Sequence, residues 1–373
     1  MKIVIASDSF KGTLSSFDIC HLYKDELVQH PSIIAQYLPI ADGGEGSLKA
    51  ISNSVKGRHI IVKAKNPYFN EIDTQYFIDK DNNAYLETAS CAGLCLIEKL
   101  NPRMTTTYGL GQQVFDALKR GCKRIYIFLG GSATNDGGCG LFTALGTKFF
   151  NTEGKVFVPT GGTLIDIARI DNSLTDNLLK DIEIIGMCDV DNPLYGLSGA
   201  SYIYAPQKGA DKKMIVDLDE GLKNLAQIVN RDLGKDIAKV KGSGAAGGLG
   251  GGILAFGHGQ LESGIEAILN LIEFDMKIDD ADYIISGEGK LDRQSLSGKA
   301  IKGIATRCQK FNKKLILIVG ISEFTIEEAQ EFFPCIVDII ETNECHIPFS
   351  KIKNQAPQMY TKAIQELLSK IKD

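Results

Sequence analysis

The segment KIVIASDSFKGTLSSFD, residues 2–18, predicts the beginning of a β-loop-α unit. Its apolar run Lys2 to Ala6 favours a short buried strand. A polar loop follows, and Ser15 with Asp18 three residues later resembles the capping box that opens a helix. A buried strand that leads through a polar loop into a helix is typical of α/β proteins with a parallel sheet.

Both ends of the chain repeat this order of strand, loop and helix. Further strands are expected at residues 33–38, 283–286, 314–319 and 335–340, with a helix at 46–55 and a last helix that places Tyr360, Ile364, Leu367, Leu368 and Ile371 on one face. We therefore expect a discontinuous Rossmann-like α/β domain with a parallel sheet, formed by residues 1–65 and 275–373.

The middle of the chain has shorter apolar segments joined by turn-rich stretches. Strands are expected at residues 60–65, 74–78, 84–87, 124–129, 183–188 and 201–204, and helices at 111–120 and 211–233. Short strands joined by tight turns favour antiparallel pairing. These features predict an inserted mixed-sheet α/β domain of residues 66–274, with the active site in the cleft between the two domains.

Composition argues against several classes of protein. The 373 residues suit two domains. The net charge of -5 does not indicate a basic surface that would bind nucleic acid or membrane, so a small-molecule partner is favoured. No apolar stretch reaches the roughly 18 residues of a membrane helix, and no signal peptide is evident, so we expect a cytoplasmic protein. We expect it to be a monomer or homodimer. The 9 cysteines and 5 histidines lack the spacing of a disulfide framework or zinc site.

Five loops share one composition, in which glycine, hydroxyl, amide and carboxylate residues directly follow an apolar strand. These loops are residues 8–13, 41–47, 130–140, 189–196 and 287–292. The loops after parallel strands meet at one edge of the sheet, where α/β proteins bind ligands. Glycine lets backbone N–H groups approach phosphate oxygens closely. Any one loop could equally be a tight turn, but five in one chain favour a binding site.

The first two loops offer a cation and two carboxylates. Lys11, close to Ser9, stands at a strand-to-helix junction, where it could hold a carboxylate or phosphate. Asp42 and Glu45 stand three residues apart with only glycines between them. Such oxygen ligands suit Mg²⁺, which bridges substrate phosphates. We expect these two acids to hold the metal, and a solvated turn with incidental acids is the alternative.

Later loops supply candidate groups for the substrate and the phosphates. GGSATNDGG, residues 130–138, has little apolar surface to bury and predicts a loop that wraps a polar ligand. Asp189 or Asp191 could accept a hydroxyl proton or hold a metal. Lys208 lies beside a glycine and could bind a transferring phosphoryl group. The alternative is a solvated surface lysine.

Two standard nucleotide motifs are absent in their functional form. GSGAAG, residues 242–247, fits GxGxxG, but no clear strand precedes it, so we reject a dinucleotide-binding fold. The motif GxxxxGK[ST] does not occur, because Gly298-Lys299 is followed by Ala300. The signatures of protein kinases are missing as well.

Taken together, these segments resemble the bacterial glycerate kinase family, the type found in glyoxylate and glucarate metabolism. Seven ordered motifs carry the resemblance: DSFKG at 8–12, ADGGEG at 41–46, TTTYG at 105–109, GGSATNDGG at 130–138, CDVDNPL at 188–194, PQKGA at 206–210, and GEG at 287–289 with Asp292 and Gln294. Ser7, where proline is expected, and Ser286, where threonine is expected, depart from the family pattern without removing a charged or amide group.

The resemblance implies transfer of phosphate from ATP to glycerate, giving 2-phosphoglycerate, and a fold of two α/β domains. Phosphoryl transfer depends mainly on alignment and on neutralisation of charge. From that chemistry we assign catalytic roles to Asp189, Lys208 and Lys11; substrate binding to Ser9, Lys11, Asn135, Asp136 and Asn192; nucleotide or phosphate binding to Gly130, Gly131, Ser132, Gly287, Glu288 and Asp292; and metal binding to Asp42 and Glu45.

Three other functions are compatible with parts of this pattern. A kinase of a related small hydroxy acid would share every phosphate-handling feature and differ only in the acceptor pocket. A non-catalytic metabolite-binding protein would have lost some of the lysines and carboxylates, all of which are present here. A nicotinamide-dependent oxidoreductase requires a strand before the glycine motif, and the sequence predicts none.

Overall fold

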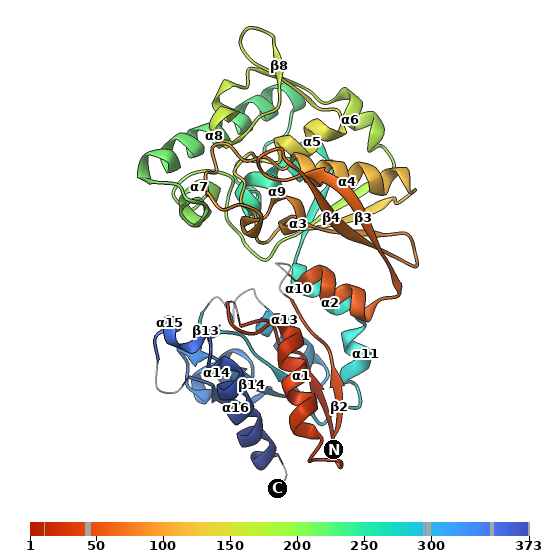
Figure 1. The fold of residues 1–373 in the computed structure, drawn as a ribbon, viewed down its shortest axis with the longest axis vertical. Coiled ribbons are helices and arrows are strands. Elements are labelled where there is room, and N and C mark those ends of the chain that lie inside the picture. Colours follow the sequence, from red (N-terminus) through yellow and green to blue (C-terminus); the bar gives the residue numbers. More distant parts are fainter. Residues whose placement is uncertain (11, 42–45, 294, 296–299, 344–346, 372–373) are drawn as a thin grey trace. The chain divides into compact units, whose positions relative to one another are not determined.

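The structure is a computed structural model that describes residues 1–10, 12–41, 46–293, 295, 300–343 and 347–371. The chain divides into two compact units (Figure 1). Unit 1 comprises Met1–Asp42, Lys49–Ser54 and Ile265–Asp373. Unit 2 comprises Gly43–Leu48 and Val55–Gly264. The predicted α/β class, with one parallel and one mixed sheet, is confirmed.

A five-stranded sheet forms the centre of unit 1. Its order is β16-β14-β12-β1-β2, and every neighbouring pair is parallel. The strands are β1 (Lys2–Ile5), β2 (Ile34–Tyr37), β12 (Tyr283–Ser286), β14 (Lys314–Val319) and β16 (Ile336–Glu341). All five predicted strands are therefore confirmed, and segments from both ends of the chain pair within one sheet.

Helices α1 (Ser16–Leu27) and α16 (Ala356–Lys370) share one hydrophobic core with this sheet. The predicted capping box is present, because the Ser15 side chain accepts from the Asp18 N–H and the Asp18 carboxylate accepts from the Ser15 N–H. The ring of Tyr360 in α16 packs edge-on against Tyr23 of α1, with centroids 6.2 Å apart. Aromatic packing of this kind fixes the two helices against each other.

Several shorter elements complete unit 1. They are the larger part of α2 (Ser47–Ser54) and of α10 (Gly264–Leu271), together with α11 (Phe274–Ile278), α13 (Ala300–Lys310), α14 (Ile326–Phe332), α15 (Phe349–Ile352), β13 (Lys290–Leu291) and β15 (Ile321–Ser322). Arg307 of α13 forms ion pairs of 2.7 Å with Glu266 of α10 and with Asp275 of α11. Since the Arg307 side chain is largely buried, these pairs join three helices of the unit.

A six-stranded mixed sheet forms the centre of unit 2, in the order β11-β10-β6-β5-β4-β3. The strands are β3 (Gly57–Lys65), β4 (Glu71–Asp79), β5 (Ala84–Glu87), β6 (Arg124–Phe128), β10 (Glu183–Met187) and β11 (Gln260–Glu262). β3, β4 and β5 pair antiparallel, as predicted, whereas β5, β6, β10 and β11 are parallel.

The two units differ from the predicted domain boundaries, for example at two segments. Residues 57–65, expected in the first domain, pair along their whole length with β4 and belong to unit 2. Residues 265–274, expected in the inserted domain, belong to unit 1. In both cases, contacts with residues distant in the sequence determine the unit to which the segment belongs. Local changes in the sequence pattern do not predict these contacts.

Helices and a small antiparallel sheet surround the main sheet of unit 2. The helices are α3 (Ala89–Ala92), α4 (Tyr108–Lys119), α5 (Cys139–Leu145), α6 (Ser173–Leu178), α7 (Ala200–Tyr204), α8 (Lys212–Leu233) and α9 (Ala245–Phe256), and the small sheet is β8 (Val156–Phe157), β7 (Lys148–Phe150) and β9 (Arg169–Asp171). The predicted strand at 201–204 is wrong: these residues belong to helix α7, which packs on α8 and α9.

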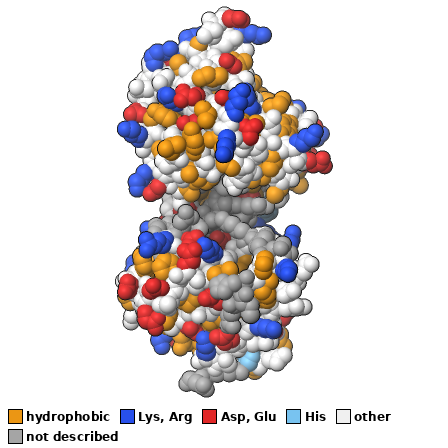
Figure 2. All heavy atoms as spheres, turned by 90° about the vertical axis from the view of Figure 1, so that its left-hand side faces the viewer, with side chains coloured by type: hydrophobic (Ala, Val, Ile, Leu, Met, Phe, Trp, Pro, Cys, Tyr) orange, Lys and Arg blue, Asp and Glu red, His pale blue; other side chains and the backbone are white. Residues whose placement is uncertain are grey.

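Acidic and basic side chains are interspersed over each unit on the face drawn in Figure 2. In the part of the chain that the structure describes, no helix has the length and apolar character needed to cross a membrane. The described cysteines are free thiols.

Candidate active site

Two loops follow neighbouring parallel strands of unit 2 and carry most of the predicted catalytic and substrate groups. β6 and β10 are in register, with Phe128 opposite Met187. Consequently the loop that begins at Leu129 and the loop that begins at Cys188 leave the same edge of the sheet. This is the edge at which α/β proteins bind ligands.

Lys208 is buried beneath the first of these loops. Its side chain is 1% exposed, and Nζ donates to Ser132 Oγ over 2.9 Å and to the Thr134 carbonyl over 2.6 Å. Burial lowers the pKa of Lys208 to about 7, while the negative charge of Asp136 acts in the opposite direction. The lysine predicted from sequence is thus part of a buried network, and it is not a solvated surface residue.

Asp136 fixes the turn of the same loop. Its Oδ2 atom accepts from the Thr107 N–H over 2.7 Å and from Thr107 Oγ1 over 2.8 Å, and its carboxylate also accepts from the N–H groups of Gly138 and Gly140. Burial raises the pKa of Asp136, and the hydrogen bonds from Thr107 oppose that shift. The carboxylate that was predicted to bind substrate therefore accepts hydrogen bonds from groups within the same unit.

Glycine is required where this loop turns. Gly137 and Gly138 have φ angles of 61° and 75°, in the left-handed region that side chains rarely adopt. A Cβ atom on Gly140 would lie 2.1 Å from Thr106 Oγ1. These glycines let the loop close tightly against the segment that contains Thr107.

Asn135 presents an unused acceptor. Its Nδ2 atom donates to Ser201 Oγ over 3.2 Å, whereas its buried Oδ1 atom has no hydrogen-bond partner among the described residues. The Thr134 hydroxyl is likewise buried without a partner among them. Since buried polar atoms are usually hydrogen-bonded, these two atoms are candidates for contacts with a ligand or an ordered water.

Asp189 and Asn192 lie on the loop after β10. Asp189 is half-buried, and its Oδ1 atom accepts from Ser263 Oγ over 2.7 Å. Both ends of the Asn192 amide are hydrogen-bonded, because Nδ2 donates to the Ser198 carbonyl and Oδ1 accepts from Tyr204 OH of α7. Asn192 thus holds the shape of the loop that carries Asp189.

Asp191 differs from Asp189 although only one residue separates them. Its side chain is 78% exposed and forms an ion pair with Lys241. An exposed pair of this kind contributes little to stability. Of the two acids left open by the sequence, Asp189 is the one held in a defined position.

In unit 1, the loops after β1 and β12 meet. The Asp8 N–H donates to the Gly287 carbonyl over 3.0 Å, and Ser7 Oγ donates to the same oxygen over 3.1 Å. A Cβ atom on Gly287 would lie 1.7 Å from the Ile318 carbonyl, so only glycine fits where the loop after β12 passes β14. Two of the five predicted ligand-binding loops, 279 residues apart in the chain, therefore lie side by side.

A cavity of about 360 Å³ opens at this edge of unit 1. Ser9 and Glu288, two of the predicted ligand-binding residues, line it, together with side chains from α15 and α16. Asp292 does not line this cavity and instead accepts from the Ser295 N–H over 3.0 Å.

Lys11 and the two predicted metal ligands, Asp42 and Glu45, lie outside the described residues. Elsewhere in the described chain, no group of three or more His, Cys, Asp or Glu side chains could hold a metal ion.

The structure also adds residues that the sequence did not single out. Ser263 contacts Asp189 from the segment after β11, and a lone serine has no local signal that could reveal this. Thr107 lies in the motif TTTYG, which was noted without a role. Of the cavity residues of α16, Tyr360 belongs to the predicted apolar face, whereas Ala356 and Met359 do not.

Comparison with known proteins decides the family. Residues 3–372 match the sequence profile of the glycerate kinase family. The chain belongs to this family. A glycerate kinase of Bacillus cereus (strain ATCC 10987 / NRS 248) is 43% identical over 324 residues, which cover 86% of this chain and 85% of the relative. The glycerate 2-kinase of Escherichia coli (strain K12) is 40% identical over 326 residues, covering 86% and 85%.

A solved structure agrees with this glycerate kinase family assignment. The crystal structure from Salmonella typhimurium LT2, provisionally assigned as glycerate kinase 2, superposes with a TM-score of 0.82 at 34% identity. The superposition covers 100% of this chain and 98% of the Salmonella chain. This chain therefore shares the fold of that Salmonella structure.

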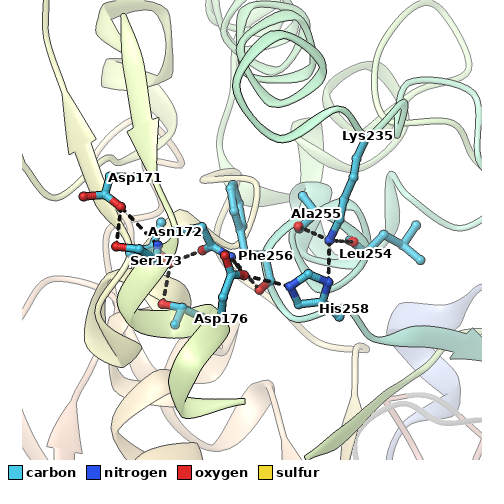
Figure 3. Close-up of polar contacts among 11 residues, drawn as sticks. Asp171, Asn172, Ser173, Asp176, Lys235, Leu254, Ala255, Phe256 and His258 are labelled. Atoms are coloured by element: carbon cyan, nitrogen blue, oxygen red, sulfur yellow. Dashed lines mark hydrogen bonds and ion pairs between the residues drawn. The ribbon is translucent and has the colours of Figure 1, made fainter. Parts of the chain in front are cut away.

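In this glycerate kinase family member, a polar cluster around His258 also lies in unit 2 (Figure 3). The Asp176 carboxylate lies 2.7 Å from His258 Nε2, and Lys235 Nζ lies 3.1 Å from His258 Nδ1. Asn172 Nδ2 donates to Asp176 over 2.6 Å. Because His258 precedes β11, the cluster lies near the amino ends of the parallel strands, the edge opposite the candidate site. We assign it to stability of the fold.

Proposed function

We propose that this chain transfers the γ-phosphate of ATP to a hydroxyl of glycerate, giving phosphoglycerate. The observation that carries the proposal is the family match over residues 3–372, supported by relatives named glycerate kinase at 37% to 43% identity. ATP is the phosphate donor that membership of this kinase family implies. The favoured product is 2-phosphoglycerate from D-glycerate, because the Escherichia coli relative is named glycerate 2-kinase.

Asp189 is the proposed base or orienting group for the attacking hydroxyl. A carboxylate in this role must be held still and must keep one oxygen within reach of the substrate. The hydrogen bond from Ser263 to Oδ1 supports the first requirement, and partial exposure of the side chain supports the second. Asn192 supports the role indirectly, because it fixes the loop.

The loop of residues 130–138 is the proposed binding segment for the polar groups of substrate and phosphate. Gly130, Gly131 and Ser132 would contribute backbone N–H groups, and Asn135 Oδ1 would accept from a glycerate hydroxyl. Lys208 and Asp136, expected from the sequence to be catalytic and substrate-binding, are instead proposed as positioning residues, since both are buried and hydrogen-bonded within the unit. The charge of Lys208 below the loop would also favour an anion above it.

The loops of unit 1 are the proposed site for the nucleotide. Ser9, Gly287 and Glu288 belong to the two loops that meet there, and Asp292 follows them in the chain. Lys11 would add a positive charge for phosphate or carboxylate. Asp42 and Glu45 would hold Mg²⁺, which is usually bound by one or two carboxylates together with substrate phosphates and water. The ion would neutralise charge on the transferring phosphoryl group.

One experiment tests the function directly. The protein is incubated with ATP, Mg²⁺ and D-glycerate, and the phosphorylated product is identified by ³¹P NMR. We expect 2-phosphoglycerate and an equal amount of ADP. Formation of 3-phosphoglycerate would contradict the proposed acceptor hydroxyl. Turnover with another small hydroxy acid but not with glycerate would contradict the proposed substrate.

A further inference from the structure

We propose that the cavity of unit 1 binds the adenosine moiety of ATP. This inference rests on the proposed function and adds to it the location of the nucleoside. The cavity lies at the carboxyl edge of a parallel sheet and has a volume of about 360 Å³, within the range of small-molecule sites. The residues that line it all belong to unit 1.

Apolar side chains make up much of the cavity wall. They come from three parts of the chain: Phe10 and Leu14 from the segment after β1, Ile321 from β15, and Ile352, Met359 and Tyr360 from α15 and α16. Phe10 and Tyr360 pack edge to face, with ring centroids 5.2 Å apart. Since both rings are largely buried, this part of the wall is fixed before any ligand binds.

The chemistry of the wall distinguishes between the two substrates. Glycerate carries a carboxylate and two hydroxyls on three carbons, so apolar walls would remove its polar groups from water without replacing their hydrogen bonds. A purine instead presents two flat apolar faces that pack well against aliphatic and aromatic side chains. Adenosine is therefore the better occupant of this cavity.

The polar residues of the cavity connect it with the proposed phosphate loops. Ser9 and Glu288 line the cavity and also belong to the loops after β1 and β12. A nucleotide whose base lies against α16 would thus direct its phosphates toward these loops. Asn343 shapes the neighbouring wall, because its amide donates to the Ile347 carbonyl and accepts from the Ile347 N–H.

The backbone at the cavity also excludes side chains. A Cβ atom on Gly320 would lie 2.2 Å from the Gly289 carbonyl. The Gly320 N–H donates to the Glu288 carbonyl over 3.1 Å. The loops after β12 and β14 therefore contact each other directly at the cavity, and no side chain can enter between them.

Filling the cavity tests the proposal. Met359 is half-buried and lines the cavity, whereas its neighbour Gln358 is exposed on α16 and does not line it. Binding of ADP and of inorganic tripolyphosphate to the full chain is measured by calorimetry for wild type, Met359→Trp and Gln358→Trp. We expect Met359→Trp to weaken ADP binding at least tenfold and to leave tripolyphosphate binding unchanged. Gln358→Trp should bind both as the wild type does. Equal ADP affinity in all three folded proteins would overturn the proposal.

A second measurement does not depend on how the variant folds. The wild-type chain is photolabelled with 8-azido-ADP and digested, and the labelled peptides are identified by mass spectrometry. Labelling within residues 320–323 or 347–360, reduced by excess ADP, supports the cavity. Labelling confined to peptides of unit 2 overturns it.

Neither measurement requires turnover, so the two proposals can fail separately. If glycerate is not phosphorylated but Met359→Trp loses ADP binding, the proposed function is wrong and the nucleoside site stands. If phosphoglycerate forms while ADP labels only unit 2, the nucleoside site is wrong and the proposed function stands.

Discussion

The Nζ atom of Lys208 donates to the Oγ atom of Ser132 over 2.9 Å, joining two segments that lie 76 residues apart in the chain. The contact holds a buried cation directly beneath a glycine-rich loop. Burial of an ammonium group is unfavourable unless its hydrogen bonds are satisfied, and here Ser132 and the Thr134 carbonyl provide two of them. The stability of the loop and the protonation of Lys208 are therefore coupled.

Lys208→Met should change how stability depends on pH. The pKa of Lys208 is lowered to about 7 by burial, whereas an unfolded lysine has a pKa of about 10.4. Between these values the unfolded chain holds one more proton than the folded chain, so the contribution of Lys208 to stability rises with pH. It is lowest below pH 7, where both states are protonated. The free energy of unfolding of Lys208→Met relative to wild type should therefore fall from pH 7 to pH 9, by up to about 1.4 kcal/mol per pH unit.

Urea denaturation at pH 7, 8 and 9 measures this difference. Lys223→Met is a suitable control, because Lys223 lies on the surface of α8 in an exposed pair with Glu220. The control should differ from wild type by the same amount at all three pH values. If the difference between Lys208→Met and wild type were also independent of pH, the lowered pKa assigned to Lys208 would be wrong.

Asp189→Asn should abolish most turnover without loss of the fold. If Asp189 positions or deprotonates the acceptor hydroxyl, kcat should fall by about 10² or more, the scale of general acid–base effects. Asp191→Asn removes the same charge from the same loop, but Asp191 is exposed and pairs only with Lys241 among the described residues. Steady-state kinetics should thus separate the two variants. Similar kcat values for both would remove Asp189 from its role.

Ser263→Ala should reduce turnover to a smaller extent. Its hydroxyl contacts Asp189 and is proposed to orient the carboxylate, so the loss corresponds to one hydrogen bond of about 1 kcal/mol, or about fivefold in kcat. Ser263→Thr keeps the hydroxyl and should restore most of the rate. In the Asp189→Asn background, Ser263→Ala should have little further effect, because the carboxylate it orients is gone. Additive effects in the double variant would indicate an independent role for Ser263.

The fold was largely predictable because its signals are local. The burial and contacts of the candidate site residues were not predictable in this way. β1 carries a continuous apolar run, α1 a capping box and α16 an apolar face, each within a few residues. Tyr202 and Ile203 favour a strand by propensity, yet packing of α7 on α8 and α9 makes the segment helical. The burial of Lys208 depends on a loop far away in the chain, and no local pattern reports it.

Asp42→Asn combined with Glu45→Gln should change the Mg²⁺ dependence of the rate. If these acids hold the ion, the Mg²⁺ concentration that gives half-maximal rate at saturating ATP should rise about tenfold or more, because Mg²⁺ affinity depends on the number of carboxylate ligands. Titration of the rate with Mg²⁺ measures this. An unchanged titration curve would show that the metal is held elsewhere, or by the nucleotide alone.

Asn172→Ala should destabilise the chain and leave catalysis unchanged. The Asn172 side chain is buried; it accepts from Thr147 Oγ1 over 2.7 Å and donates to the Asp176 carboxylate and the Phe256 carbonyl (Figure 3). Removing it leaves buried partners unsatisfied, so we expect a loss of about 2–3 kcal/mol in the free energy of unfolding. Because the cluster lies at the amino edge of the parallel strands, kcat and KM for glycerate should stay within about twofold of wild type.

Asn53→Ala is the matched control for this last change. The Asn53 amide is exposed on α2 and makes one hydrogen bond, to the Lys49 carbonyl. Its loss should cost less than about 0.5 kcal/mol, as for most surface substitutions. Urea denaturation and steady-state kinetics on the same preparations compare the two variants. A fall in kcat for Asn172→Ala at a temperature where it remains folded would mean that the two edges of the sheet are coupled, and the assignment of this cluster to stability alone would then be wrong.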